Sequence, residues 1–300
     1  MLKYFDKYLL PKWVQQSWNI HEISDATEEQ LYAEIRWGLQ RLRSERPMVS
    51  IVIPAWNEEK TIARTLYSLS KIRTKYPTEL IIVNNNSTDN TQTILDACGV
   101  MSIMERRQGI AQARQTGLLA AKGTYILSGD ADTLYPEAWV NVMMEELMKE
   151  NVVAVWGKHS FVPTESTNRT SFALYESIKQ VLYRFRGIKR PYLNAMGANV
   201  GYKKEIAYRV GGYDVTARRG SDGRLAMAMF PHGTIAAVRS PKATVWTDAR
   251  RFNFDNGMMH SLLRRAVKEL PRMAEYAGLS KRDFTKLSGF QNNSAPLGQE

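Results

Sequence analysis

Residues 125–136 read YILSGDADTLYP, and the rest of the chain is organised around this stretch. The apolar run 125–127 has the length of a β-strand, and the small residues Ser128 and Gly129 after it let the backbone turn. Two carboxylates, Asp130 and Asp132, follow directly. This order predicts a buried strand that ends in an acidic loop.

The acidic loop has two interpretations. Ligands of an α/β sheet bind at the carboxyl ends of its strands, where two carboxylates would attract Mg²⁺ or Mn²⁺ together with phosphate oxygens. The alternative is a polar turn whose aspartates only hydrogen-bond the backbone, because D-x-D is a short pattern. The surrounding sequence has to decide between the metal site and the polar turn.

Apolar runs that end in polar turns recur along the chain. Each turn is followed by a segment with helical spacing, such as Ile62, Leu66 and Leu69, and we expect Asn57 to cap one helix and Pro136 to open another. Repeated strand–turn–helix units predict an α/β fold with a mostly parallel sheet flanked by helices. The expected strands cover residues 49–53, 80–83, 101–104, 125–127 and 152–156.

Composition limits the classes of partner. The net charge of +11 and the pI of about 9.6 favour acidic partners: nucleotide phosphates, anionic lipid or nucleic acid. The basic residues are dispersed and no recognised nucleic-acid motif is present, so we expect no nucleic-acid partner. The single cysteine, Cys98, excludes an internal disulfide and suits a reducing compartment. Without a signal peptide or a run of about 18 apolar residues, the expected location is cytoplasmic, with peripheral contact at the inner face of the membrane left open.

Two extensions flank the α/β pattern. In residues 1–47, Thr27 and Gln30 form an expected capping box, and the helix after it has an apolar face of Leu31, Ile35, Leu39 and Leu42. Residues 257–300 begin with a predicted basic amphipathic helix over about 258–270 and end in a polar tail expected to be disordered. Contact with anionic membrane and packing on the body of the protein are both open for each extension.

The motifs together resemble one family. In order, VSIVIPAWNEEKTIARTLYSL, LIIVNNNSTDNT and RRQGIAQARQTGLLAAKGTYILSGDADTLYP resemble the GT-A nucleotide-diphosphosugar glycosyltransferases of family 2. The resemblance covers about residues 48–252. It implies a Rossmann-like GT-A catalytic domain over 48–256, with a nucleotide-binding half at 48–158 and an acceptor half at 159–256.

The resemblance also implies the sites of the sugar donor. Arg114 would lie near the donor, Asp130 near the ribose and the metal, and Asp132 would be the direct ligand of Mn²⁺ or Mg²⁺. Arg250 and Arg251 match a family segment that would clamp the pyrophosphate. The implied contacts of the base and ribose are Pro54, Ala55, Asn57, Glu58, Asn84 and Asn85.

The chain departs from the family at Asn84 and Asn85, where aspartate is usual. Asparagine keeps a carbonyl acceptor for the imide N–H of uracil but loses a charge-assisted hydrogen bond, which leaves the identity of the base less certain. A turn rich in left-handed conformers is a compatible role for the same asparagines.

The acceptor half carries a second set of matches. NAMGANVGYKKEIAYRVGGYD at 194–214 resembles the acceptor-side segment of the family, which implies acceptor contacts for Gly197 and Asn199. Ser221 and Asp222 occupy the place of the usual Glu-Asp pair, so Asp222 would accept the proton of the attacking hydroxyl. An aspartate that only pairs with neighbouring arginines is the alternative for Asp222.

The expected function is therefore metal-dependent, inverting transfer of a sugar from a nucleotide-diphosphosugar. A UDP-sugar is favoured as donor, and the acceptor would be a sugar or a lipid-linked sugar in cell-surface glycan or glycolipid synthesis. Two alternatives remain: a catalytically inactive nucleotide-sugar-binding or scaffold protein, and a nucleotidyltransferase, for which PAWNEEK lacks the expected Gly-rich signature.

Overall fold

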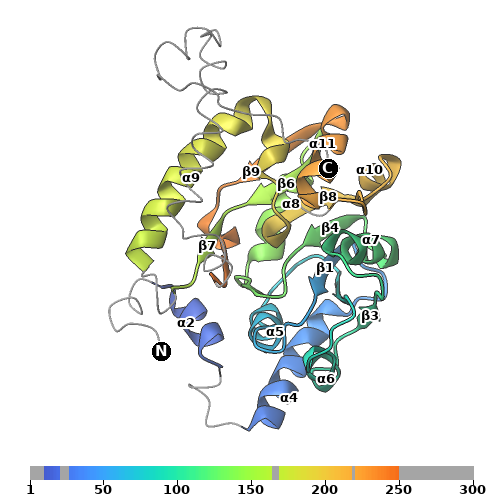
Figure 1. Cartoon of the computed structure of the whole chain (residues 1–300), viewed down its shortest axis with the longest axis vertical. Helices are drawn as coiled ribbons and strands as arrows, with labels where there is room; N and C mark the ends of the chain where they lie inside the picture. Colours follow the sequence, from blue (N-terminus) through green and yellow to red (C-terminus); the bar gives the residue numbers. More distant parts are fainter. Residues whose placement is uncertain (1–9, 21–26, 164–168, 218–219, 250–300) are drawn as a thin grey trace, which may run out of the picture.

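The computed structural model describes residues 10–20, 27–163, 169–217 and 220–249 (Figure 1). Within these ranges the centre is a seven-stranded sheet in the order β3-β2-β1-β4-β8-β6-β9. Only β8 runs antiparallel to its neighbours β4 and β6, and the other pairs are parallel. The strands are β1 (Val49–Ala55), β2 (Thr78–Asn84), β3 (Ser102–Met104), β4 (Tyr125–Ser128), β6 (Val152–Gly157), β8 (Val200–Lys203) and β9 (Thr234–Val238). A smaller three-stranded sheet contains β5 (Thr133–Leu134), β10 (Val245–Thr247) and β7 (His159–Phe161).

Helices cover both faces of the central sheet. A hydrophobic core lies on each face of the sheet, and alternate residues of β1 point into one or the other. Ile51 and Ile53 pack with α4, α5 and α8, whereas Val52 packs with α7 and α11. Figure 1 shows α4, α5 and α6 at one end of the molecule and α9 along its outer side. The helices are α2 (Lys12–Trp18), α4 (Glu28–Leu39), α5 (Ile62–Ser70), α6 (Thr91–Ala97), α7 (Ile110–Ala120), α8 (Trp139–Leu147), α9 (Arg169–Lys189), α10 (Lys204–Arg209) and α11 (Ser221–Met229), with 3-10 turns η1 (Gln40–Leu42), η2 (Pro191–Asn194), η3 (Gly197–Asn199), η4 (Phe230–His232) and η5 (Pro241–Ala243).

A buried polar group aligns the inner strands. All residues of β1 and β2 are buried, as expected of a sheet covered on both faces. The Ser50 hydroxyl donates to Glu79 Oε1 at 2.5 Å, and the same carboxylate oxygen accepts from the backbone N–H of Lys122. The Gly123 N–H donates to Ser50 Oγ. These satisfied hydrogen bonds hold the chain entering β4 against β1 and β2.

The N-terminal helix behaves as the sequence predicts. The capping box of α4 is confirmed, because Gln30 N donates to Thr27 Oγ1 and Thr27 N donates to Gln30 Oε1. Its apolar face is buried against α5 and the main core. Residues 1–9 and the predicted helix at 258–270 lie outside the described residues. Within the described ranges, none of the helices combines the length and apolar character needed to span a membrane.

The expected strands are confirmed, but two expected helix starts are wrong. Helix α5 begins at Ile62 rather than beside Asn57, because Asn57 takes a left-handed conformation with φ of +53°. Helix α8 begins at Trp139 rather than at Pro136. The N–H of Trp139 donates to the carbonyl of Pro136, which lies in the turn before the helix. Both turns form loops at the carboxyl edge of the sheet, and that edge holds the candidate site.

Candidate active site

The D-x-D loop is folded around one tyrosine. The Tyr135 hydroxyl accepts from the N–H of Asp130 at 2.8 Å and donates to the carbonyl of Asp130 at 3.1 Å. Burial raises the pKa of Tyr135 well above its ordinary value, so the phenol keeps its proton. A Cβ at Gly129 would lie 2.2 Å from the same hydroxyl, so only glycine fits there. Tyr135 and Gly129 thus hold the loop from within the stretch, and Thr65 and Ser68 of α5 hold it from outside.

Asp132 lies between two strands of the small sheet. Its carboxylate accepts long hydrogen bonds from Thr133 Oγ1 at 3.3 Å and Thr247 Oγ1 at 3.4 Å, and its carbonyl accepts from Asp248 N. Among the described residues, no group of three or more His, Cys, Asp and Glu side chains could enclose a metal ion. The role of Asp130 and Asp132 as ligands of Mg²⁺ or Mn²⁺ therefore stays a prediction, in which such an ion would take further oxygens from water and phosphate.

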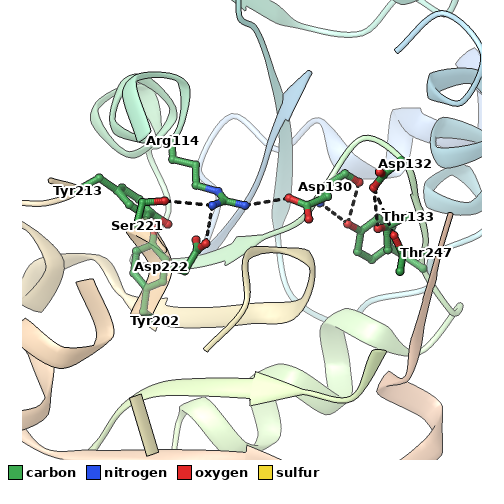
Figure 2. A network of polar contacts seen from close by, with 10 residues as sticks. Arg114, Asp130, Asp132, Thr133, Tyr202, Tyr213, Ser221, Asp222 and Thr247 are labelled. Atoms are coloured by element: carbon green, nitrogen blue, oxygen red, sulfur yellow. Dashed lines mark hydrogen bonds and ion pairs between the residues drawn. The ribbon is translucent and has the colours of Figure 1, made fainter. Parts of the chain in front are cut away.

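A buried arginine joins the two halves of the domain. Arg114, on α7, is 4% exposed and donates from Nη2 to Asp130 Oδ1 at 2.8 Å. From Nη1 it donates to Asp222 Oδ2 at 2.5 Å and to Ser221 Oγ at 3.2 Å. Figure 2 shows the guanidinium between the two carboxylates. The loop predicted to bind the sugar donor and the residue predicted as base are thereby held in one network.

The surroundings shift the pKa values of Arg114 and Asp222 in this network. Burial acts to lower the pKa of Arg114, but Asp222 and Asp130 outweigh it, so the pKa is raised and the guanidinium stays charged. Burial raises the pKa of Asp222; Arg114 opposes this shift and Asp130 adds to it. The backbone N–H groups of Asp222 and Gly197 also lower this pKa.

One oxygen of Asp222 stands out. Oδ1 is buried and makes no hydrogen bond of good geometry within the described part of the chain. A buried acceptor without a hydrogen bond is costly, so such atoms concentrate where a ligand completes them. Oδ1 has the chemistry of an atom that accepts a proton from a bound hydroxyl.

The predicted acceptor residues are engaged inside the protein. A Cβ at Gly197 would lie 1.7 Å from Arg114 Nη2, so the glycine lets the backbone pack against the guanidinium. Ser221 is 1% exposed and accepts from Arg114. Asn199, also 1% exposed, accepts from Trp139 Nε1 and donates to the carbonyls of Lys158 and Ala243. In this conformation the side chains of Ser221 and Asn199 bind protein groups, and their acceptor contacts stay a prediction.

A cavity of about 430 Å³ opens beside Asp130. It is formed where the loops after β1, β2 and β4 meet the start of α7. Its lining includes five residues that the resemblance assigns to the sugar donor: Pro54, Ala55, Glu58, Asn85 and Asp130. It also includes Trp56, Gln108, Gly109, Ile110 and Ala131, which we did not predict. An aromatic residue inside the PAWNEE turn was the available signal for Trp56, which is 57% exposed.

The asparagines of the turns hold the loops together. Asn57 Oδ1 accepts from Thr88 N, which links the loop after β1 to the loop after β2. Asn84 Oδ1 accepts from Ser87 N and its Nδ2 donates to Gln92.

Asn85 donates to the carbonyls of Glu105 and Arg107 and accepts from Gly109 N. The turn role of these asparagines is present, whereas their base contacts stay predictions. Arg250 and Arg251 lie outside the described residues.

A second cavity of about 430 Å³ lies between α9 and the ends of β6 and β9. Aromatic and basic side chains line it, including Trp156, Lys158, Tyr183, Arg184 and Arg239. The rings of Trp156 and Tyr183 meet edge to face, with centroids 5.6 Å apart. Most of its lining residues come from β6, β7, α9, η2 and β9.

Known proteins resemble this chain in sequence and in fold. The sequence model of glycosyl transferase family 2 matches residues 50–211. Chondroitin synthase of Escherichia coli is 26% identical over 222 residues, which cover 62% of this chain and 32% of that protein. UDP-Glc:alpha-D-GlcNAc-diphosphoundecaprenol beta-1,3-glucosyltransferase WfgD of Escherichia coli is 28% identical over 123 residues, covering 40% of this chain and 48% of that protein. The chain thus matches less than half the length of either relative.

Two solved structures show the same fold. The mannosyltransferase PcManGT from Pyrobaculum calidifontis, in complex with GDP-Man and Mn²⁺, superposes with a TM-score of 0.52 at 20% identity, over 81% of this chain and 67% of that chain. S. aureus TarS 1–349, in complex with UDP-GlcNAc, gives a TM-score of 0.53 at 17% identity, over 67% of this chain and 58% of that chain. The central sheet with helices on both faces is the GT-A fold.

Proposed function

Since this chain belongs to glycosyl transferase family 2, we propose that it moves a sugar from a nucleotide-diphosphosugar to an acceptor hydroxyl with inversion at the anomeric carbon. The observation that carries the proposal is the Arg114 network, which holds Asp130 of the D-x-D loop and Asp222 of the acceptor half at one edge of the sheet. UDP-sugars are the favoured donors, in line with the UDP-GlcNAc and UDP-Glc named for two related proteins.

The donor would occupy the cavity beside Asp130. Trp56 offers an exposed aromatic face for the base, and Asp130, which also lines the cavity, is bound by Arg114. Asp130 and Asp132 would hold Mn²⁺ or Mg²⁺ on the diphosphate, with Arg250 and Arg251 as further pyrophosphate contacts. When bound, the cation would offset the charge of the departing diphosphate.

Asp222 would act as the base. Its carboxylate takes the proton of the acceptor hydroxyl as the hydroxyl oxygen bonds to the anomeric carbon and the bond to the diphosphate breaks. The nucleoside diphosphate leaves with the electrons of that bond. Arg114 opposes the rise that burial causes in the pKa of Asp222 and so favours its carboxylate form.

The acceptor would enter from the second cavity. The aromatic pair Trp156 and Tyr183 suits the apolar face of a sugar, and Lys158 and Arg239 suit a phosphate. We therefore favour a sugar or a lipid-linked sugar as acceptor, in cell-surface glycan or glycolipid synthesis at the inner face of the membrane. WfgD, by its name, acts on a diphosphoundecaprenol-linked sugar.

Three variants test the proposal. Asp132→Ala should abolish Mn²⁺-dependent binding of UDP in calorimetric titration. Asp222→Asn should bind the UDP-sugar as wild type does but lose transfer by about 10²–10⁴-fold, the range expected of a general base. Asp214→Asn is the matched control, because Asp214 carries an exposed ion pair with Arg224 near the same helix.

Two outcomes would contradict the proposal. UDP binding that ignores both Mn²⁺ and Asp132 would favour the inactive binding or scaffold protein. Release of pyrophosphate from a nucleoside triphosphate would instead identify a nucleotidyltransferase.

A further inference from the structure

Helix α9 carries an apolar stripe on its outer face. Five large side chains on this 21-residue helix remain exposed: Leu174 at 61%, Ile178 at 39%, Val181 at 51%, Phe185 at 40% and Ile188 at 69%. Their spacing of four, three, four and three residues places them along one side. At 1.5 Å per residue the stripe is about 21 Å long. Figure 1 shows α9 at the outer side of the molecule.

Helix α9 carries apolar residues on both of its faces. A surface helix normally turns apolar residues inward and polar residues to water. The inner face of α9 contains buried aromatic residues together with Glu176 and Lys179, and the outer face adds the exposed apolar stripe. A contiguous apolar surface of this length marks an interaction site.

The charges around the stripe have one sign. Arg184 and Lys189 are exposed on the same side of α9. The single acidic residue of the helix, Glu176, is buried and forms an ion pair with Arg169 at 2.9 Å. The outer face of α9 therefore presents apolar and cationic groups, with no carboxylate among its exposed residues.

This charge distribution favours one of three possible binding partners of the stripe. A second copy of α9 would bring Arg184 and Lys189 against their own counterparts, without the acidic partners that flank paired helices. The predicted C-terminal helix of the chain carries Arg264, Arg265 and Lys268, so it would also meet like charge. An anionic lipid surface accepts both the apolar stripe and the cations.

We propose that the outer face of α9 docks on the surface of an anionic lipid bilayer. The stripe would enter the boundary between headgroups and acyl chains, with the exposed guanidinium of Arg184 at the lipid phosphates. The net charge of +11 favours the same surface. Arg184 and Ile188 of the outer face also line the second cavity, so docking would bring that cavity next to the membrane.

Vesicle cosedimentation of the full chain tests the proposal. Phosphatidylcholine vesicles are compared with vesicles of phosphatidylcholine and phosphatidylglycerol at about three to one. We expect wild type to bind the anionic vesicles and not the neutral ones. The double variant Leu174→Glu/Val181→Glu should lower the partition coefficient by about tenfold or more, since two exposed apolar side chains that would enter the bilayer become charged.

A matched variant controls for added charge. Trp37→Glu/Leu119→Glu changes two exposed apolar residues away from α9, at 69% and 58% exposure, and should bind vesicles as wild type does. UDP titration with Mn²⁺ should be unchanged in both double variants, which separates docking from the proposed catalytic function.

Other outcomes would overturn the proposal. One is equal vesicle binding by wild type and the α9 variant. Another is a wild type that is dimeric and an α9 variant that is monomeric. Absence of wild-type binding together with a lower melting temperature of the α9 variant would assign the stripe to an occupant within the chain.

Discussion

At the scale of single residues, Arg114 determines how the site is assembled. A buried charge is costly unless its hydrogen bonds are satisfied, and the planar guanidinium reaches Asp130 with one nitrogen and Asp222 with another. Lysine lacks this fork and could not hold both carboxylates in the same geometry. The packing of Gly197 against the guanidinium leaves no room for a larger residue.

The pH dependence of activity tests this network. Because burial raises the pKa of Asp222, activity should be lost on acidification at a pH above the ordinary aspartate value of about 3.9. Arg114→Gln removes the cation that opposes the shift, so the acid limb of kcat/KM should move to higher pH, and kcat should fall by roughly 10²-fold or more. The limb should stay in place in Arg224→Gln, where the ion pair is exposed.

The same shift has a consequence for stability with a defined sign. The folded state holds the Asp222 proton more tightly than the unfolded chain does. Its contribution therefore favours folding at acidic pH and is lost as the pH rises through the raised folded pKa. For activity, the network as described is contradicted if the acid limb of kcat/KM stays in place or moves to lower pH in Arg114→Gln.

At the scale of elements, short turns hold the site together as much as the strands do. Asn199 at the end of η3 joins three segments: α8 through Trp139, the turn after β6 through Lys158, and η5 through Ala243. These segments come from distant parts of the chain. The side chain works there as a buried cross-link.

Asn199→Ala should destabilise the protein by about 2–4 kcal/mol, because it leaves the Trp139 N–H and two carbonyls without partners. For a domain of this size the melting temperature should fall by about 5–15 °C in thermal unfolding. Asn141→Ala is the control, since its hydrogen bonds to Arg73 and Lys75 are exposed. An unchanged melting temperature with a raised KM for the acceptor would instead support the predicted acceptor contact.

At the scale of the whole molecule, the N-terminal helix belongs to the main core. Leu31, Ile35 and Leu39 of α4 are buried in the same cluster as β1, α5 and α8. The first part of the chain thus supports the face of the sheet opposite α7. The extension and the nucleotide-binding half should therefore unfold together.

Ile35→Ala tests this coupling. Ile35 is 0% exposed, and its truncation should cost about 2–5 kcal/mol in the free energy of unfolding. Calorimetry should show one cooperative transition at lower temperature. Trp37→Ala, two residues away and 69% exposed, should change the transition little. A separate early transition in the Ile35 variant would show that the helix is an independent unit.

The predictions from sequence succeeded where the signal is local. The apolar runs placed β1, β2, β4 and β6, and Thr27 with Gln30 placed the start of α4. They failed at Asn57 and Pro136, where a turn residue can begin a helix or a loop with the same local chemistry. Trp56 was missed because an exposed aromatic residue in a turn shows its use only when the cavity beside it is known.

The sequence by itself determined the strand pattern, the D-x-D loop and the family, because periodicity and short motifs report local burial and turn chemistry. Only the tertiary structure decided which polar groups meet. Arg114 reaches Asp222 108 residues further along the chain, and Asn199 is used within the protein interior. The outward position of the α9 stripe was equally hidden, because helical spacing shows that apolar residues share a side but not whether that side faces the protein or the solvent.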